Sequence, residues 1–314
     1  MKEKISVAEA QEIILNASPR LGGETLGFSA AQGRILAEPI TAGRTLPPLD
    51  NSAMDGYALR SEDIKAAAPG SPVSLPVVFE VPAGGQGPRP LVAGEAARIF
   101  TGAPVPLGAD TVVEQEVVEA RKGRACFQAA APLGQHIRRA GEDVKAGDVV
   151  LQSGTQLGPG HLGLLASVGR TFVHVNQRPR VALLSSGDEL VEPDGDPTGG
   201  RIVSSNSYSL AAQCRELGVE TNYLGIAGDT PESVEAHLRA GLSSDILITS
   251  AGVSVGDHDH VRPLLEKLGC KLLFWGVRMK PGFPVTFGQF EPGQGPLVFG
   301  LPGNPVSAMV CFEQ

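Results

Sequence analysis

Two aspartates in the segment 245–259, whose sequence is DILITSAGVSVGDHD, are the first candidates for chemistry in this chain. The apolar run 246–248 predicts a strand before their loop, and apolar residues at helical spacing from Val261 onward predict a helix after it. In an α/β domain, such a loop lies at the carboxyl end of a strand, beside helix N–H groups that favour anions. Asp257 and Asp259 are therefore predicted to bind a cation that bridges the protein and a phosphate-like ligand.

Two histidines, His258 and His260, alternate with these aspartates and raise the question of a zinc site. A spacing of two residues in a loop that enters a helix matches no closed zinc pattern, and the hard oxygen atoms of carboxylates suit Mg²⁺ better. We interpret the histidines as solvated or capping residues and predict that the aspartates bind magnesium.

Three further loops leave the ends of predicted strands, at residues 185–190, 227–230 and 301–305. Because each crossover of a doubly wound sheet returns the chain to the same side, all these loops gather at one edge. Carboxylates held close together repel one another, so a divalent cation or nearby Lys and Arg must offset their charge. The acidic residues of this candidate cleft are Asp188, Glu189, Asp229, Asp257 and Asp259.

The basic candidate nearest in sequence is Lys280, directly before a Pro-Gly pair, with Arg278 two residues earlier. If both residues lay on a strand, their side chains would share a face.

The first half of the chain holds a second set of candidates, each with a purely structural alternative. The segment 45–60, with two prolines and two aspartates, is a loop by composition, so Asp55 belongs to a turn or to a site. Thr101 follows a predicted strand, where a hydroxyl forms a turn or binds a ligand. Two adjacent arginines, Arg138 and Arg139, precede Glu142 and Asp143 and make either surface ion pairs or an oxyanion site.

The nucleotide-binding motifs give no support for a dinucleotide or P-loop enzyme. GPGHLG at 158–163 fits the letters of GxGxxG, but the expected βαβ unit with a ribose-binding acid is not evident. We predict instead that Pro159 begins a helix and that Gly169 ends it. The sequence contains neither GxxxxGK[ST] nor the GxSxG elbow of many hydrolases.

The composition limits the classes of protein that need to be considered. A chain of 314 residues is long enough for two or three domains, and its net charge of −8 argues against general nucleic-acid binding. It has no apolar run of about 18 residues, so no membrane span is predicted. Its first residues predict a helix with a capping box at Ser6 and Glu9 rather than a signal peptide, which favours a cytoplasmic protein.

The four cysteines are widely separated and form no CxxC pair, so they are interpreted as reduced structural thiols: Cys126, Cys214, Cys270 and Cys311.

Several motifs in a fixed order cover almost the whole chain. They are PPLDNSAMDGYALR, RIFTGAPVPLGADTVVEQE, IRRAGEDV, SSGDEL, SAGVSVGDHDHV, MKPGFPVTFG and GLPGNPVSA. Together they resemble the molybdopterin molybdenumtransferases, the MoeA and gephyrin E-domain family, and the resemblance runs from about residue 5 to the last residue. It implies an enzyme that transfers molybdenum from molybdate to adenylylated molybdopterin, requires Mg²⁺ and releases AMP.

The resemblance also implies a multidomain architecture. A doubly wound α/β molybdopterin-binding domain would span 178–314, a small β-rich domain 51–139, and a discontinuous linker domain 1–50 with 140–177. Short apolar runs separated by Pro and Gly between 73 and 127 agree with the β-rich part. Family members usually continue into a further small β-barrel, which is expected to be absent here.

By motif position, the resemblance assigns roles to individual residues. Asp55, Thr101, Arg138, Asp143, Glu189 and Lys280 match positions tied to activity. The metal ligands would be Glu189, Asp229, Asp257 and Asp259. The substrate-binding residues would be Gly252, Ser254, Gly256, Pro302, Gly303 and Pro305. The family cleft is shared across a homodimer, so the N-terminal residues would face the α/β domain of the partner chain, and contacts with other cofactor-synthesis proteins are possible.

Two positions that are frequently basic in the family are occupied by Phe283 and Gly276 here. Less positive charge would weaken the affinity for molybdate or mark a subgroup. Two alternative functions stay open: the adenylyltransferase of the same pathway, and a molybdopterin-binding scaffold without turnover. Residues 40–150 speak against the adenylyltransferase, which is typically a single α/β domain, and the carboxylate set speaks against a scaffold.

Overall fold

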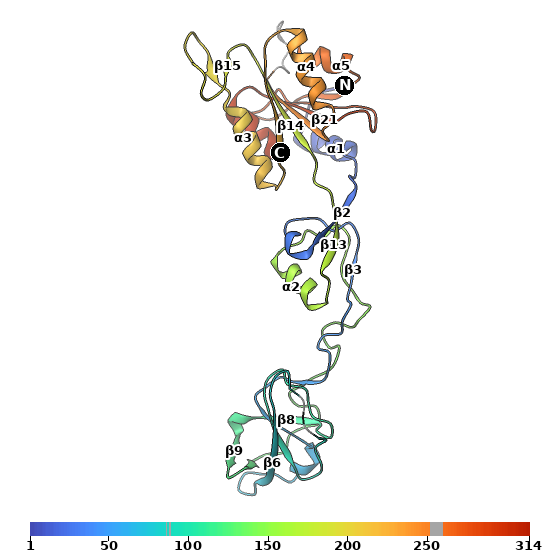
Figure 1. The fold of residues 1–314 in the computed structure, drawn as a ribbon, viewed down its shortest axis with the longest axis vertical. Coiled ribbons are helices and arrows are strands. Elements are labelled where there is room, and N and C mark those ends of the chain that lie inside the picture. The colour runs from blue at the N-terminus through green and yellow to red at the C-terminus, as the bar shows by residue number, and fades with distance from the viewer. Residues whose placement is uncertain (86, 88, 252–259) are drawn as a thin grey trace. The chain divides into compact units, whose positions relative to one another are not determined.

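The computed structural model describes residues 1–85, 87, 89–251 and 260–314. The chain divides into two compact units. The first contains Met1–Gly23 and Asn176–Gln314, and the second contains Glu24–Val175. The second unit is thus inserted into the sequence of the first, and both chain ends belong to the first unit (Figure 1).

The first unit is built on a seven-stranded sheet. Its strand order is β1 (Lys2–Ile5), β19 (Lys271–Val277), β20 (Thr286–Gln289), β21 (Leu297–Leu301), β18 (Ile246–Ser250), β14 (Val181–Ser186) and β17 (Thr221–Ala227). All neighbouring pairs are parallel except the two that involve β20. The predicted doubly wound α/β domain is confirmed, with β20 as an antiparallel strand inside an otherwise parallel sheet.

Helices cover both faces of this sheet. On one face, α4 (Pro231–Gly241) and α5 (Val261–Lys267) pack on Ala182 and Leu184. On the other face, α1 (Val7–Ala17), α3 (Ser205–Glu216) and α6 (Pro305–Glu313) pack on Val181 and Leu183. Figure 1 shows α3 and α4 on opposite sides of β14. Because both faces are covered, the whole of β14 is buried, which explains its unbroken apolar run Val181–Leu184.

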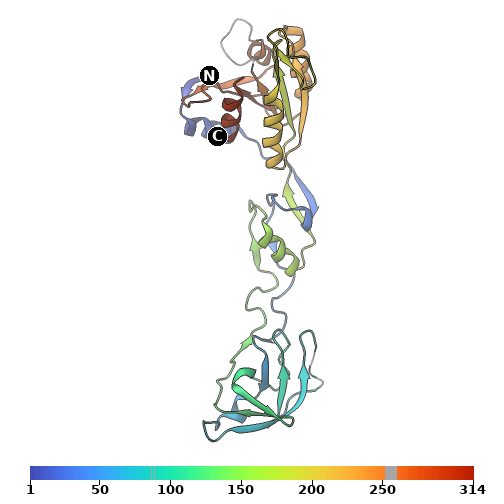
Figure 2. The ribbon, with the colours of Figure 1, turned by 90° about the vertical axis from the view of Figure 1, so that its left-hand side faces the viewer.

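The N-terminal segment joins the edge of this sheet. Lys2 pairs with Phe274 in parallel register, and the predicted helix follows with Ser6 as its N-cap, whose hydroxyl accepts from the N–H of Glu9 at 3.2 Å. Figure 2 shows α1 beside α6, and Nε2 of Gln11 donates to the carbonyl of Gln314 at 2.8 Å.

This arrangement corrects the expected domain division for residues 1–23. They were assigned to the linker domain, but they belong to the α/β unit because β1 extends its sheet and α1 covers its apolar face.

The second unit contains a six-stranded sheet. Its order is β8 (Thr111–Glu114), β5 (Gly56–Leu59), β7 (Ala96–Ile99), β6 (Val73–Val81), β10 (Arg124–Phe127) and β9 (Val118–Arg121). Strand β4 (Asn51–Ser52) pairs with β11 (Ile137–Arg138) outside this sheet. The β-rich part of the predicted fold is therefore present in this unit.

A smaller hydrophobic cluster surrounds α2 (Pro159–Ser167). It is formed by residues from the beginning and the end of the sequence of the second unit. It includes Leu36, Ile40, Leu165 and Val175, and β3 (Ile40–Thr41) pairs with β12 (Val149–Leu151) beside it. Pro159 begins this helix and Gly169 follows it with φ of +79°, as predicted. Phe28–Ala30 forms one 3₁₀ turn. The separation of a linker domain from the β-rich domain stays a prediction.

None of the helices in the described ranges is long and apolar enough to cross a membrane.

Candidate functional site

Asp188 and Asp229 lie in the loops that follow β14 and β17, and the two loops are joined through these residues. The backbone N–H of Asp188 donates to Oδ2 of Asp229 at 3.2 Å, and the N–H of Asp229 donates to Oδ1 of Asp188 at 2.9 Å. A Cβ at Gly228 would lie 3.0 Å from Oδ1 of Asp188, so a side chain there would crowd this carboxylate. The structure therefore brings together two of the carboxylates predicted for the sheet edge.

Glu189 is exposed in the same loop and borders a small cavity. The backbone of Gly187 has φ of +144°, and a Cβ at this position would collide with the Glu189 carboxylate. The cavity has a volume of about 90 Å³, and its lining also includes Ser250, Gly303 and Pro305. Glu189 thus lies beside two of the residues predicted to bind the substrate.

The loop after β21 leads directly into α6. The side chain of Asn304 accepts from the N–H of Ser307 at 3.1 Å and caps the helix, and Pro305 is its first residue. Pro at this position and an Asn cap both favour the start of a helix. Of the predicted loop residues, Gly303 and Pro305 are exposed, whereas Pro302 is buried.

The side chain of Asn206 connects the end of β18 to the loop after β21. Its Nδ2 donates to Oγ of Ser250 at 2.7 Å and to the carbonyl of Gly303 at 2.9 Å. The side chain is buried, with 8% of the residue exposed, and it lies near the start of α3. Sequence reasoning missed Asn206 because its function depends on contacts between distant segments, and no spacing in the sequence marks it.

The two basic candidates near the sheet do not have the geometry considered for them. Strand β19 ends at Val277, so Arg278 and Lys280 lie beyond the strand and the alternation of a strand does not apply to them. Both residues are exposed, and the N–H of Arg278 donates to the carbonyl of Ile5 at 2.7 Å.

The two unusual residues Gly276 and Phe283 lie against each other. Gly276 has φ of +79°, and a Cβ on it would lie 3.1 Å from the tip of the Phe283 ring. That ring also packs edge-on against Trp275, with ring centres 5.6 Å apart. Gly276, Phe283 and Trp275 therefore pack together in one place.

In the second unit, Asp55 and Thr101 are directly bonded. Oδ1 of Asp55 accepts from both the N–H and the hydroxyl of Thr101, each at 2.7 Å. Hydrogen bonds that stabilise the ionised form lower the pKa of the Asp55 carboxyl, first from the Thr101 N–H and then from its hydroxyl, with a smaller contribution from the charge of Arg98. Asp55 is therefore held as a carboxylate with one oxygen already engaged.

Arg138 and Asp143 form an ion pair at 2.5 Å. The neighbouring Arg139 instead pairs with Asp50 at 2.6 Å. The N–H of Ala140 also donates to Asp50, and this bond together with Arg139 lowers the pKa of the Asp50 carboxyl. Both candidate arginines are thus held by a carboxylate, which favours the ion-pair interpretation and still leaves guanidinium donors for an oxyanion.

Five predicted residues lie outside the described part of the chain: Gly252, Ser254, Gly256, Asp257 and Asp259. Within the described ranges, no group of three or more His, Cys, Asp or Glu is close enough to hold a metal ion. The oxygen donors of Asp188, Asp229 and Glu189 nevertheless suit Mg²⁺, which is commonly bound through one or two carboxylates together with substrate phosphates.

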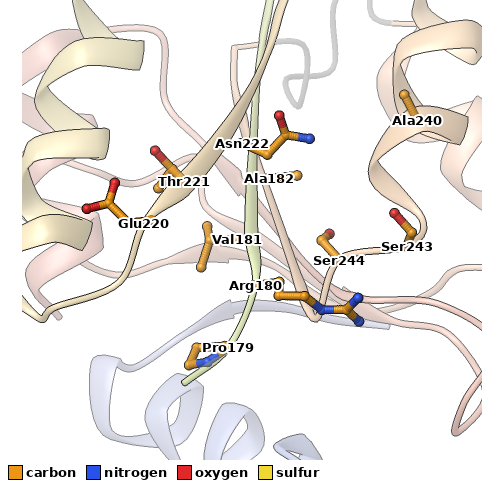
Figure 3. Close-up of a pocket in the computed structure, with 10 residues that line it drawn as sticks. All are labelled: Pro179, Arg180, Val181, Ala182, Glu220, Thr221, Asn222, Ala240, Ser243 and Ser244. Carbon is orange, nitrogen blue, oxygen red and sulfur yellow. The ribbon is translucent and has the colours of Figure 1, made fainter. Parts of the chain in front are cut away.

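Two larger hollows lie away from these residues. One, of about 530 Å³, lies at the opposite ends of β14 and β17 and is lined by Arg180, Glu220 and Ser244 among others (Figure 3). The other, of about 710 Å³, lies in the second unit beside Leu49 and Leu107. Neither hollow is lined by a residue of the predicted site, so the volume of these two hollows does not indicate where the predicted site lies.

Comparison with known families covers both units. A family described as "MoeA N-terminal region (domain I and II)" matches residues 5–169, and one described as "Probable molybdopterin binding domain" matches residues 182–314.

Similar whole chains come from several organisms. A molybdopterin molybdenumtransferase from Nostoc sp. is 42% identical over 98% of this chain and 72% of its own length. Molybdopterin molybdenumtransferase 2 of Mycobacterium tuberculosis is 39% identical over 98% of this chain and 77% of its own length. The crystal structure of a molybdopterin biosynthesis protein from Pyrococcus horikoshii is 32% identical, with a TM-score of 0.83 over 99% of this chain and 76% of that chain.

Proposed function

Because this chain belongs to the molybdopterin molybdenumtransferase family, we propose that it inserts molybdenum from molybdate into adenylylated molybdopterin and releases AMP. The observation that carries this proposal is the pairing of Asp188 with Asp229, next in the chain to Glu189, which borders the small cavity. This arrangement collects oxygen donors for a cation at the edge of the sheet where a phosphate group is expected to bind.

Glu189 and Asp229, with Asp257 and Asp259, are the proposed ligands of Mg²⁺. When bound, the ion would neutralise the charge of the substrate pyrophosphate and favour its hydrolysis. The reciprocal bonds between Asp188 and Asp229 place one oxygen of each carboxylate against a backbone N–H. The protein thereby keeps two carboxylates close together before the substrate arrives, which limits reorganisation during the reaction.

The loop 302–305 and the start of α6 are proposed to hold the phosphate end of the pterin, together with Gly252, Ser254 and Gly256. The first N–H groups of a helix attract anions, and Asn304 orients this turn by capping α6. Exposed Lys280 would add a positive charge that moves freely enough to reach an anionic group.

The second unit is proposed to contribute to the handling of molybdate. The Arg138 guanidinium is held by Asp143 and keeps further N–H donors that suit a tetrahedral oxyanion. Asp55 and Thr101 form a fixed pair whose carboxylate and hydroxyl can orient a substrate group. We further propose a cytoplasmic homodimer in which this set completes the site of the partner chain.

The decisive experiment incubates the purified chain with adenylylated molybdopterin, Mg²⁺ and molybdate and measures AMP. The proposed activity requires AMP release that depends on both ions. A chain that instead makes adenylylated molybdopterin from ATP and molybdopterin would be an adenylyltransferase, and one that binds the pterin without AMP release would be a scaffold. Either outcome would contradict the proposal.

A further inference from the structure

Arg98 is a half-buried arginine in β7 that lies three residues before Thr101. In the sheet it stands opposite Tyr57 of β5 and Glu80 of β6. Its side chain extends towards the start of β5, where Asp55 precedes the first strand residue, Gly56.

The guanidinium is held by four contacts. Nη1 donates to the carbonyl of Gly56 at 3.0 Å, and Nη2 donates to Oε1 of Gln115. The guanidinium carbon lies 5.1 Å from the centre of the Tyr57 ring and 4.9 Å from that of Phe100. A planar guanidinium can lie over two rings and donate to two acceptors at once. A lysine ammonium cannot reproduce this combination of contacts.

Three of these four contacts adjoin the pair formed by Asp55 and Thr101. Gly56 is the residue after Asp55, and Phe100 is the residue before Thr101. Gln115 contacts Asp55 itself, because its N–H donates to the carbonyl of Asp55 at 3.0 Å. Arg98 therefore connects the three chain segments that determine where the Asp55 carboxylate and the Thr101 hydroxyl lie.

We propose that Arg98 is a positioning residue for the Asp55–Thr101 pair, holding the turn after β7 against the start of β5. This inference builds on the proposed function, in which that pair orients a substrate group. Arg98 itself acts through Gly56, Gln115 and Phe100 rather than on the substrate.

The surrounding charges agree with this role. The positive charge of Arg98 contributes to the lowered pKa of the Asp55 carboxyl, after the two hydrogen bonds from Thr101. The neighbouring carboxylate of Glu114 is paired with His136. Exposed Glu80 and Glu116 lie on the flanking segments, and Oε1 of Glu116 accepts from Nε2 of Gln115 at 3.3 Å.

The test follows the amide resonance of Thr101 in the full chain by NMR as a function of pH. Because this N–H donates to Asp55, its chemical shift reports the ionisation of that carboxyl. In Arg98→Gln the midpoint should move to higher pH, because both the nearby charge and the support of the turn are lost. In Arg98→Lys the midpoint should move by a smaller amount, because lysine keeps the positive charge but cannot donate to both Gly56 and Gln115 as the guanidinium does.

Arg89→Gln is the matched control. Arg89 also lies over an aromatic ring of the second unit, 5.7 Å from the centre of Phe79, but it pairs with Glu95 and touches neither Asp55 nor Thr101. Its replacement should leave the Thr101 titration unchanged. An Arg98→Gln protein that retains its thermal unfolding transition and shows the wild-type midpoint would overturn the proposal.

A second measurement separates this inference from the proposed function. If the wild-type chain releases AMP, Arg98→Gln should lower kcat by between about tenfold and 100-fold, with a smaller change in KM. A changed KM with unchanged kcat would contradict the positioning role. If the wild-type chain releases no AMP, the proposed function fails, and the Thr101 titration still decides whether Arg98 positions the pair.

Discussion

Asp188 and Asp229 each accept a hydrogen bond from the backbone N–H of the other, at 2.9 Å and 3.2 Å. The loops after β14 and β17 are therefore held together by two carboxylates whose charges repel. Such an arrangement is stable when the N–H groups, and a bound cation, offset the repulsion. The pair therefore joins the two loops, and its member Asp229 is also a proposed ligand of Mg²⁺.

Asp229→Asn separates these two roles. The amide oxygen still accepts from Asp188, so the loops stay joined, but one negative charge is lost. We expect the Mg²⁺ concentration for half-maximal AMP release to rise by about tenfold or more, while thermal unfolding changes little. Asp194→Asn, which changes an exposed carboxylate of another loop, is the control. An unaltered Mg²⁺ dependence in Asp229→Asn would exclude this residue as a ligand.

Glu189→Gln should abolish AMP release and leave pterin binding mostly intact. Glutamine has nearly the same shape, so the close contact with Gly187 is retained while the charge beside the cavity is removed. AMP formed in a single turnover and molybdopterin retained through gel filtration measure the two effects. AMP release at the wild-type rate would rule out the proposed metal role.

Asn206→Ala removes the donors to the buried hydroxyl of Ser250 and to the carbonyl of Gly303, and leaves both acceptors without them. The free energy of unfolding should fall by about 1–3 kcal/mol. The chain has a single tryptophan, Trp275 in β19, so its fluorescence during urea unfolding reports on the α/β unit. Asn222→Ala, at an exposed position of β17, should stay within about 0.5 kcal/mol of wild type. Equal losses in both variants would contradict the bridging role.

Gly276→Lys should be more destabilising than Gly293→Lys. Both glycines have φ of +79°, which costs about 1–2 kcal/mol for a residue with a side chain. Nothing lies within 4 Å of the Cβ position at Gly293, whereas the Phe283 ring lies 3.1 Å from that at Gly276. Urea unfolding followed through Trp275 measures the difference. If the two losses are the same, the packing of Phe283 does not explain the glycine.

Asp245→Asn should lower stability at neutral pH but not in acid. The hydrogen bonds and charge of Arg180 lower the pKa of the Asp245 carboxyl below its ordinary value in the folded state. Its contribution is therefore complete above the ordinary pKa of about 3.9 and disappears as the pH falls through the lower folded value. Arg180→Gln should lose stability over the same pH range. A cost of Asp245→Asn that is as large at pH 3 as at pH 7 would refute the assignment.

Much of the α/β unit could be predicted because its strands are apolar runs between turn signals. β14, β18 and β21 are of this kind, and Pro231 and Pro305 mark the starts of α4 and α6. β1 could not be recognised, since KEKI has no strand pattern of its own and becomes a strand only by pairing with β19. Its absence from the prediction explains why residues 1–23 were assigned to another domain.

The site was predictable where topology alone determines the neighbours. The rule that parallel strands end at one edge correctly placed Asp188 near Asp229, but it could not predict that each binds the backbone of the other, because this depends on loop conformation. Asn206 and Arg98 were missed for a related reason. Their partners come largely from segments distant in sequence, so neither role could be read from the local pattern, even though Arg98 begins one of the motifs quoted above.

The insertion of Glu24–Val175 into the α/β unit has a consequence for the order in which the chain folds. During synthesis on the ribosome, the inserted unit is complete before any strand from β14 onward has been made. The edge strand β1 and helix α1 are made before the inserted unit, yet their partners β19 and α6 are made after it. Domains generally fold as they leave the ribosome, and pairings between distant segments form slowly. Residues 1–23 are therefore expected to remain unpaired and accessible to chaperones or proteases until β19 and α6 have been translated.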